Sequence, residues 1–261
     1  MEMGGILDND LLRWLSQVVP VALRVGGLFT FGPFFGDRAI PNRIKAGLLL
    51  MLTILLVPVT PARPMLFGPV DWARMVLGEL LVGLLMSMSL AVVFEGMQFA
   101  GQLSGIQLGL SLATLFDPQS NADSPALSVF YNLMTLLLFL QMDIHHWILR
   151  ALTRSFEYLP VGSAVANQLV TRELVNVVGS LFGLGIQIAA PVLVFTMMID
   201  LMLGFISKAS PTLPVLLFGI PIKNLTGYAI LMGASTLWPG ILERRFATAI
   251  GTAERMLHMA R

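Results

Sequence analysis

Residues 96–120 read GMQFAGQLSGIQLGLSLATLFDPQS, and the stretch carries no charge until it reaches Asp117-Pro118. The part from 96 to 116 is long enough to cross a bilayer as a helix, which takes about 20 apolar residues. Its Gly, Gln and Ser residues are unusual for a helix that faces lipid, because such a helix is apolar on every side. The stretch therefore predicts a membrane helix that faces protein or water.

Similar apolar stretches recur along the 261-residue chain. Its mean hydropathy is +0.81 and only 12% of its residues are charged, about half the share in a typical soluble domain. The alternating ten-residue strands of a membrane barrel are not found in the sequence. We therefore expect an all-α, polytopic, membrane-associated protein with no separate soluble domain, and with spans at 46–61, 80–94, 96–116, 124–142, 174–199 and 224–242.

Composition and motifs exclude several classes of function. The net charge of +1 gives no bulk attraction for nucleic acid. The absence of cysteine removes disulfides, thiolate metal sites and a cysteine nucleophile. The sequence lacks the HExxH, GxSxG and phosphate-loop patterns, so we expect no catalytic residue, no cofactor and no enzyme activity.

Proline and glycine interrupt two of the apolar regions, at 24–36 (RVGGLFTFGPFFG) and at 209–224 (ASPTLPVLLFGIPIKN). Proline removes a helix hydrogen bond, and in hydrocarbon the freed carbonyl needs another partner. Two interpretations remain open: ordinary kinks in a bundle, or discontinuous helices around a cavity. The tail 243–261 mixes charged and apolar residues and is predicted to be an interfacial amphipathic helix.

A helix through 98–112 would place its small and polar residues on defined faces. Gly101, Gly105 and Gly109 recur at spacing four, which allows another helix to approach closely. Packing between two spans of the same chain would explain these glycines. It explains the nearby polar side chains less well, because each needs a hydrogen-bond partner: Gln98, Gln102, Ser104 and Gln107. A position inside an assembly, or along a wet channel, is the alternative.

The helix is expected to end at Asp117, because the residue before a proline avoids helical geometry. Ser124-Pro125 is a typical helix start, with Ser as the N-cap and Pro at the first position. Between them lies the polar loop DPQSNAD at 117–123. The loop is either a functional element on rigid supports or a simple connection between helices.

These motifs resemble the FliR family, the flagellar members of the export-gate proteins of type III secretion. The similarity rests on GQLSGIQLGLSLATLFDPQSNADSPALSVFYNL at 101–133, in which FDPQS is the most specific element. It extends in the same order to RVGGLFTFGPFFGDRAIPNRIKAGLLL at 24–50, GELLVGLLMSMSLAVVFEGMQFAG at 78–101 and ISKASPTLPVLLFGIPIKNLTGY at 206–228.

The resemblance implies one subunit of a hetero-oligomeric helical ring in the bacterial inner membrane, at the flagellar basal body. Its implied partners are the P-type and Q-type gate subunits, the autocleaving export switch protein, unfolded export substrates and membrane lipid. Residues 1–160 would be P-type-like, and residues 161–261 Q-type-like. The ring would be a conduit for export.

The resemblance also implies that the loop at 108–122 plugs this conduit. Leu115 and Phe116 would form its apolar tip, because a hydrophobic constriction excludes water and ions. Gly109 and Pro118 would act as its hinges. The plug residues are then expected to be Gly109, Ser111, Leu115, Phe116, Asp117, Pro118, Gln119 and Ser120.

Ionisable residues in or beside apolar runs are candidate buried charges, because such groups are costly at bilayer depth. Those in this chain are Glu79, Glu95, Asp200, Lys208 and Lys223. The acids are interpreted either as a proton relay or, more simply, as groups that meet water or an Arg of a neighbouring subunit.

The pair His145-His146 follows Asp143, but adjacent residues point to different helix faces, so no metal site is expected. The alternatives to a flagellar gate subunit are a secondary transporter with discontinuous helices and a homologous gate subunit of a virulence-type injectisome.

Overall fold

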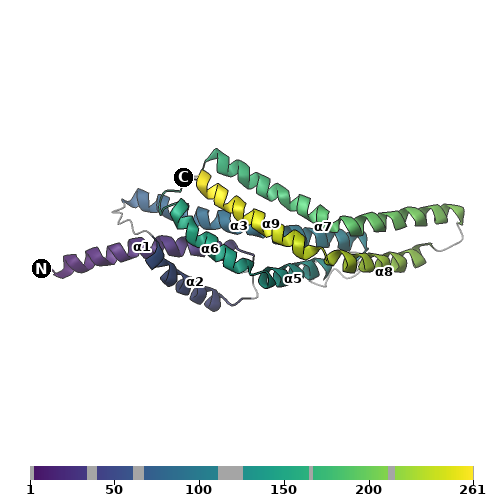
Figure 1. Cartoon of the computed structure of the whole chain (residues 1–261), viewed down its shortest axis with the longest axis horizontal. Coiled ribbons are helices and arrows are strands. Elements are labelled where there is room, and N and C mark those ends of the chain that lie inside the picture. Colours follow the sequence, from purple (N-terminus) through teal and green to yellow (C-terminus); the bar gives the residue numbers. More distant parts are fainter. Residues whose placement is uncertain are drawn as a thin grey trace. The chain divides into compact units, whose positions relative to one another are not determined.

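The computed structural model describes residues 3–33, 40–60, 68–110, 126–164, 167–210 and 215–260. Regular structure within these ranges is helical throughout, which confirms the predicted fold class (Figure 1). The elements are α1 (Met3–Phe31), α2 (Asn42–Leu56), the 3-10 turn η1 (Val57–Val59), α3 (Pro69–Gln107), α5 (Ala126–Gln141), α6 (Ile144–Tyr158), α7 (Gln168–Ala209), α8 (Val215–Ser235) and α9 (Trp238–Met259).

The predicted boundary between spans 80–94 and 96–116 is wrong. Residues 80–94 and 96–107 belong to one helix of 39 residues, α3, which ends at Gln107 and not at the expected Asp117. Glu95 at the expected boundary lies exposed on the helix surface, so its charge needs no break in the backbone. The span expected at 174–199 is likewise part of a longer helix, α7, of 42 residues with Pro191 inside it.

Several helices have the length and composition to cross a membrane. Among the described residues these are three: Asn42–Val59, Val70–Gln107 and Gln168–Ala209. The pairs α5–α6 and α8–α9 would add two more if each counts as one span bent at a short break. The expected span at 224–242 falls across the second of these breaks. The structure thus supports membrane helices, some of which are broken.

The chain forms two compact units that are interleaved in sequence. Unit 1 comprises residues 1–92, 143–177 and 246–261, and unit 2 comprises residues 93–142 and 178–245. The helices α3, α7 and α9 each supply residues to both units. The expected correspondence of 1–160 and 161–261 with two kinds of gate subunit stays a prediction.

Unit 1 is built on a glycine contact between α1 and α3. A Cβ atom on Gly83 would lie 2.5 Å from the carbonyl oxygen of Arg24 and 2.8 Å from the Cα of Gly27. A Cβ on Gly27 would in turn lie 3.0 Å from the carbonyl oxygen of Leu80. Two backbones can meet this closely only where neither helix carries a side chain.

The part of α9 from residue 246 onward is packed into unit 1, so the prediction that the apolar face of the tail 243–261 lies against the membrane interface is wrong. Met256 and Leu257 are fully buried, because the apolar face of α9 is covered by the protein itself. The end of α9 runs beside the start of α7, where Arg255 pairs with Glu173 and Asn167 donates to the Met259 carbonyl (Figure 1).

We expect Gly83→Ala to lower the stability of the protein by about 1–3 kcal/mol, as overpacking of a close contact does. The new methyl group meets backbone atoms of α1, which cannot move aside as a flexible side chain can. The thermal unfolding midpoint of the detergent-solubilised protein measures this loss.

The matched control is Gly251→Ala on α9, where a Cβ would meet no atom within 4 Å. This variant should be neutral or more stable, because Ala favours a helix over Gly by about 1 kcal/mol. Equal midpoints for the two variants would contradict the close contact between α1 and α3.

Candidate functional site at the base of the segment 111–125

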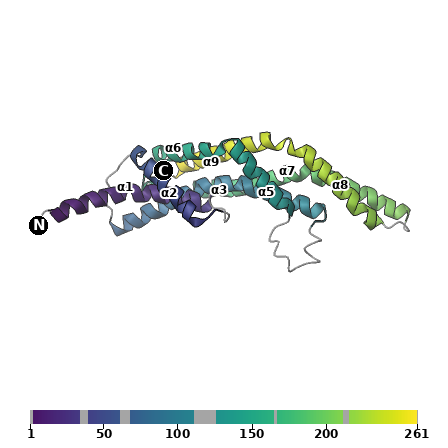
Figure 2. The same ribbon diagram turned by 90° about the horizontal axis from the view of Figure 1, so that it is seen from below.

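In unit 2 the helices α3 and α5 form a hairpin whose backbones touch (Figure 2). A Cβ on Gly101 would lie 2.6 Å from the Cα of Ser128 and 3.0 Å from the carbonyl oxygen of Leu127. The Ser128 hydroxyl donates to the Gln98 carbonyl at 3.2 Å, and the Gln98 amide donates to Asn132 Oδ1 at 3.3 Å. The predicted packing of two spans of the same chain is therefore present at Gly101.

A buried polar contact also joins the same two helices. The hydroxyls of Ser104 and Tyr131 lie 3.3 Å apart, and both side chains are fully buried. The ring of Tyr131 also packs against Trp238, with 4.6 Å between centroids. Hydrogen-bond partners within the chain were expected to be needed by several polar residues, and the structure provides one each for Gln98, Ser104 and Gln107. Gln102 is exposed instead.

The end of α3 is fixed by a glycine cap. Gly109 has φ of 77°, a backbone conformation that favours glycine. The Leu110 amide donates to the Gly105 carbonyl and the Gly109 amide to the Ile106 carbonyl, both at 3.0 Å. This pair of bonds is the Schellman motif, which satisfies the last carbonyls of a helix. Gly109 therefore terminates α3 in a defined direction.

Leu108 anchors the same helix end to α8. Its side chain is 1% exposed, and a Cβ on Gly227 would overlap it. Gly227 thus provides the space that Leu108 fills. Leu108 thus fixes the end of α3 against α8. The contact of Tyr131 with Trp238 fixes α5 against α9.

A charged group links α3, α7 and α8 beside the cap. The Lys223 ammonium lies 2.7 Å from Asp200 Oδ2, and the Gln107 amide donates to the same oxygen at 3.2 Å. The side chain of Lys223 is 17% exposed and that of Asp200 is 47% exposed. Asp200 therefore has a cationic partner in its own chain.

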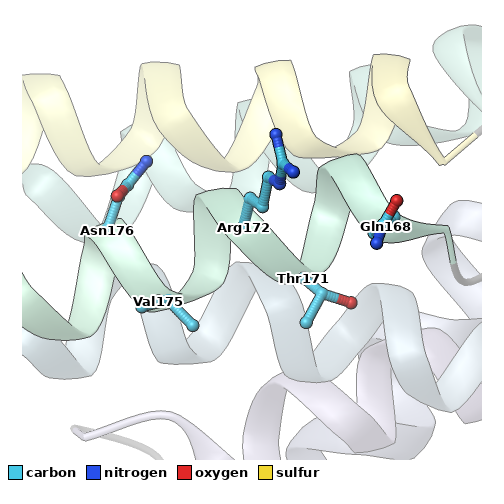
Figure 3. Close-up of a pocket in the computed structure, with 5 residues that line it drawn as sticks. All are labelled: Gln168, Thr171, Arg172, Val175 and Asn176. Atoms are coloured by element: carbon cyan, nitrogen blue, oxygen red, sulfur yellow. The ribbon is translucent and has the colours of Figure 1, made fainter.

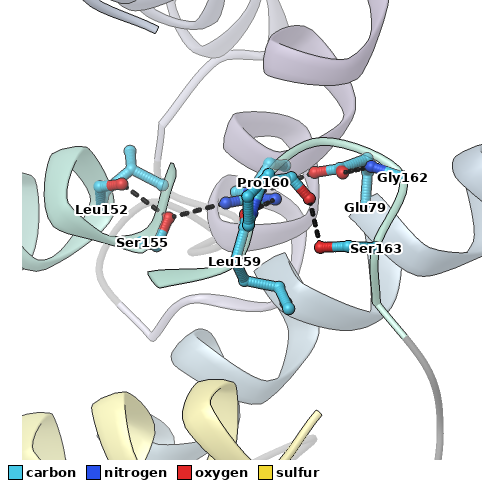
Figure 4. Close-up of polar contacts among 8 residues, drawn as sticks. Glu79, Leu152, Ser155, Leu159, Pro160, Gly162 and Ser163 are labelled. Atoms are coloured by element: carbon cyan, nitrogen blue, oxygen red, sulfur yellow. Dashed lines mark hydrogen bonds and ion pairs between the residues drawn. The ribbon is translucent and has the colours of Figure 1, made fainter. Parts of the chain in front are cut away.

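Glu79 lies in unit 1 and takes part in a fully buried ion pair with Arg24, at 2.6 Å. Its second carboxylate oxygen accepts a hydrogen bond from the Gly162 amide at 2.9 Å (Figure 4). The Arg24 guanidinium also donates to Ser155 Oγ and to the Leu159 carbonyl, and it lies 4.1 Å from the Phe156 ring centroid. These contacts join α1, α3, α6 and the turn after α6.

The remaining predicted site residues are placed differently. Glu95 and Lys208 are exposed in this chain, and whether a neighbouring subunit buries them stays a prediction. The plug residues beyond Gly109 lie outside the described residues: Ser111, Leu115, Phe116, Asp117, Pro118, Gln119 and Ser120.

His145 and His146 do not face apart, so that part of the prediction is wrong. Their ring centroids are 4.1 Å from each other, and both rings approach Asp143 Oδ1. At the first turn of α6 both side chains reach back toward the residue that precedes the helix.

A surface groove opens at the start of α7 (Figure 3). It is lined by residues of this one helix: Gln168, Thr171, Arg172, Val175 and Asn176. The groove belongs to unit 1, and its lining contains none of the predicted site residues.

Sequence reasoning missed the partner of Glu79. Arg24 is a lone cation in one apolar stretch, and Glu79 is a lone acid in another. An unpaired charge is costly in an apolar environment, so two opposite charges in apolar stretches tend to pair with each other. The sequence could therefore have predicted the pairing of Arg24 with Glu79. The pairing of Asp200 with Lys223 could have been predicted in the same way.

Comparisons with known proteins agree with one another. The model of the family described as bacterial export proteins, family 1, matches residues 15–249. The chain is 31% identical over 241 residues to the flagellar biosynthetic protein FliR of Pectobacterium carotovorum, covering 91% of each chain. It is 28% identical to that of Escherichia coli K12, covering 94% of each, and 26% identical to that of Bacillus subtilis 168, covering 95% of this chain and 97% of the relative.

Glu79→Ala should destabilise the protein by about 3–5 kcal/mol, because it leaves the Arg24 guanidinium buried without its counter-ion. Denaturant unfolding of the solubilised protein measures the effect. The double variant Arg24→Met with Glu79→Leu removes both charges and should recover part of the loss. A single variant as stable as the parent protein would contradict a buried ion pair.

Gly101→Val should separate α3 from α5, because its side chain meets the backbone of Ser128. Since the chain has no cysteine, the pair Gln98→Cys and Asn132→Cys can report the separation by the yield of disulfide on mild oxidation. The yield should fall with Gly101→Val and persist with Gln102→Val at the exposed neighbouring position. A high yield in both backgrounds would show that Gly101 does not set the approach of these helices.

Proposed function

Because the chain belongs to the bacterial export proteins of family 1 and is a membrane component of the flagellar export apparatus, we propose that it lines the export conduit and that residues 108–122 seal it. The conduit would cross the bacterial inner membrane at the flagellar basal body. The chain would have a structural and conducting role without catalysis.

The observation that carries this proposal is the rigid base of the segment 111–125. One end leaves α3 through the Gly109 cap, and the other enters α5, whose backbone contacts α3 at Gly101. A loop on a fixed base can place its tip reproducibly, which is why functional loops are often carried on rigid elements. A rigid base therefore favours the interpretation of the segment as a plug over its interpretation as a simple connection between helices.

The chemistry of the segment suits a seal. Leu115 and Phe116 would close the lumen by excluding water, whereas the polar residues around them would tolerate an aqueous conduit: Ser111, Asp117, Gln119 and Ser120. Pro118 would set the direction of the chain beyond the tip. Movement about Gly109 as a hinge would require the cap bonds of Gly109 and Leu110 to open, and it stays a prediction.

The surface of unit 2 supports a position within an assembly. Large apolar side chains are exposed along α7 and α8 and need lipid or protein to cover them: Phe195, Met198, Leu201, Met202, Phe205, Leu225 and Met232. We propose that P-type and Q-type gate subunits cover these surfaces. Within the chain, residues 1–160 would take the place of a P-type subunit and residues 161–261 that of a Q-type subunit. The autocleaving switch protein and unfolded export substrates would be further partners.

Deletion of Leu115–Gln119 tests the seal. In cells that produce the whole export apparatus, the deletion should raise resting ion leakage across the inner membrane, because it removes the apolar tip. Leakage is followed with a membrane-potential dye, and assembly is checked by co-purification of the gate subunits.

The paired substitution Leu115→Ser with Phe116→Ser should reproduce the leakage at unchanged loop length, whereas Gln119→Ala should not. Unchanged leakage from an assembled complex would reject the plug. A chain that purifies alone as a stable monomer would instead favour a secondary transporter.

A further inference from the structure

We propose that Asp143, His145 and His146 bind a divalent transition-metal ion, of which zinc is the best match, at the first turn of α6. The proposal is independent of the plug and concerns residues of unit 1 alone. It reverses the expectation from sequence that no metal binds here.

The distances among the three side chains fit a single ion. Asp143 Oδ1 lies 3.2 Å from His146 Nδ1 and 3.8 Å from His145 Nε2. One potential ligand atom from each residue lies within 4.8 Å of the others. Two ligands that each bind zinc at about 2.0–2.1 Å in a tetrahedral site are separated by roughly 3.4 Å. Small side-chain rotations would therefore bring all three atoms onto one ion.

The local backbone favours this arrangement over an ordinary helix cap. Asp143 precedes α6 in the N-cap position, where an Asp side chain usually accepts a bond from the first free amides. Here it makes no capping bond, and its φ of 55° is left-handed. Its carboxylate approaches the two imidazoles instead. The chain thus adopts a less favourable backbone conformation in a geometry that gathers three metal-binding groups.

The ligand chemistry selects the class of ion. Two imidazole nitrogens and one carboxylate oxygen suit zinc, copper or nickel, whereas calcium and magnesium prefer oxygen ligands alone. The side chains of Asp143 and His146 are 67% and 58% exposed, so the ion can enter from solvent and complete its coordination with water. Zinc fits best because it accepts a four-coordinate site with water as the remaining ligand.

Zinc titration of the complete gate complex tests the site. The complex is purified through a tag without histidine, treated with a chelator, and titrated with zinc chloride in a calorimeter. The double variant His145→Ala with His146→Ala should lose one zinc ion per chain relative to the parent complex. Asp143→Asn should weaken zinc binding at that site by at least about tenfold, because it replaces a charged ligand by a neutral one.

The control is His258→Ala, which removes the remaining histidine of the chain, on α9. This variant should bind as much zinc as the parent complex, and co-purification shows that every variant assembles. Cobalt in place of zinc should give visible absorption bands that disappear in the double variant. Equal zinc stoichiometry and affinity in the parent and the double variant would overturn the proposal. In that case the carboxylate only forms a hydrogen bond with His146 and lies near the His145 ring.

Discussion

The ion pair between Arg24 and Glu79 is the interaction on which unit 1 depends. Both side chains are fully buried, and separating either charge from the other in an apolar interior is costly. The remaining polar atoms of the pair reach Ser155 and the turn after α6, so four parts of the chain meet at one charged centre. The glycine contact of Gly27 with Gly83 brings the two helices close enough for this pair to form.

Unit 2 is organised by a related constraint. Gly101 lets α3 and α5 touch, and the polar side chains along the contact then bond to one another within the protein. A glycine-rich helix with Gln and Ser is therefore stable here because α5 completes its hydrogen bonds. The polar character of 98–107 is explained in large part by this hairpin, so the case for a conduit rests on the segment that the hairpin supports.

The sequence predicted the class of fold well and its boundaries less well. Apolar length and low charge correctly indicated membrane helices, whereas the proline-rich stretch 209–224 includes the start of α8, with Pro221 inside that helix. Glu95 suggested a boundary that α3 does not have, because an exposed charge on a long helix needs no break. The amphipathic tail was assigned to a membrane surface, since periodicity shows that a face is apolar but does not show what covers it.

The candidate site was predictable where the signal was local. The spacing of the glycines identified Gly109 as a candidate residue. Its role as a helix cap depends on a backbone angle that a sequence does not give. The partners of Tyr131 and Glu79 come from distant parts of the chain, and a single sequence gives no distance between them. The approach of His145 and His146 to Asp143 was missed because ideal helix geometry was applied to a first turn where both rings reach back.

The interleaved units set an order for how the protein is completed during synthesis. The contacts of the α3–α5 hairpin join residues between 98 and 132, so they are available once about half of the chain has been made. Unit 1 needs α6 to complete its charged centre and residues 246–261 to complete its helix packing. A nascent chain that stops before α9 therefore carries the hairpin with an unfinished unit 1. Unit 1 therefore joins α1 to residues 246–261, two parts of the chain that are made far apart in time.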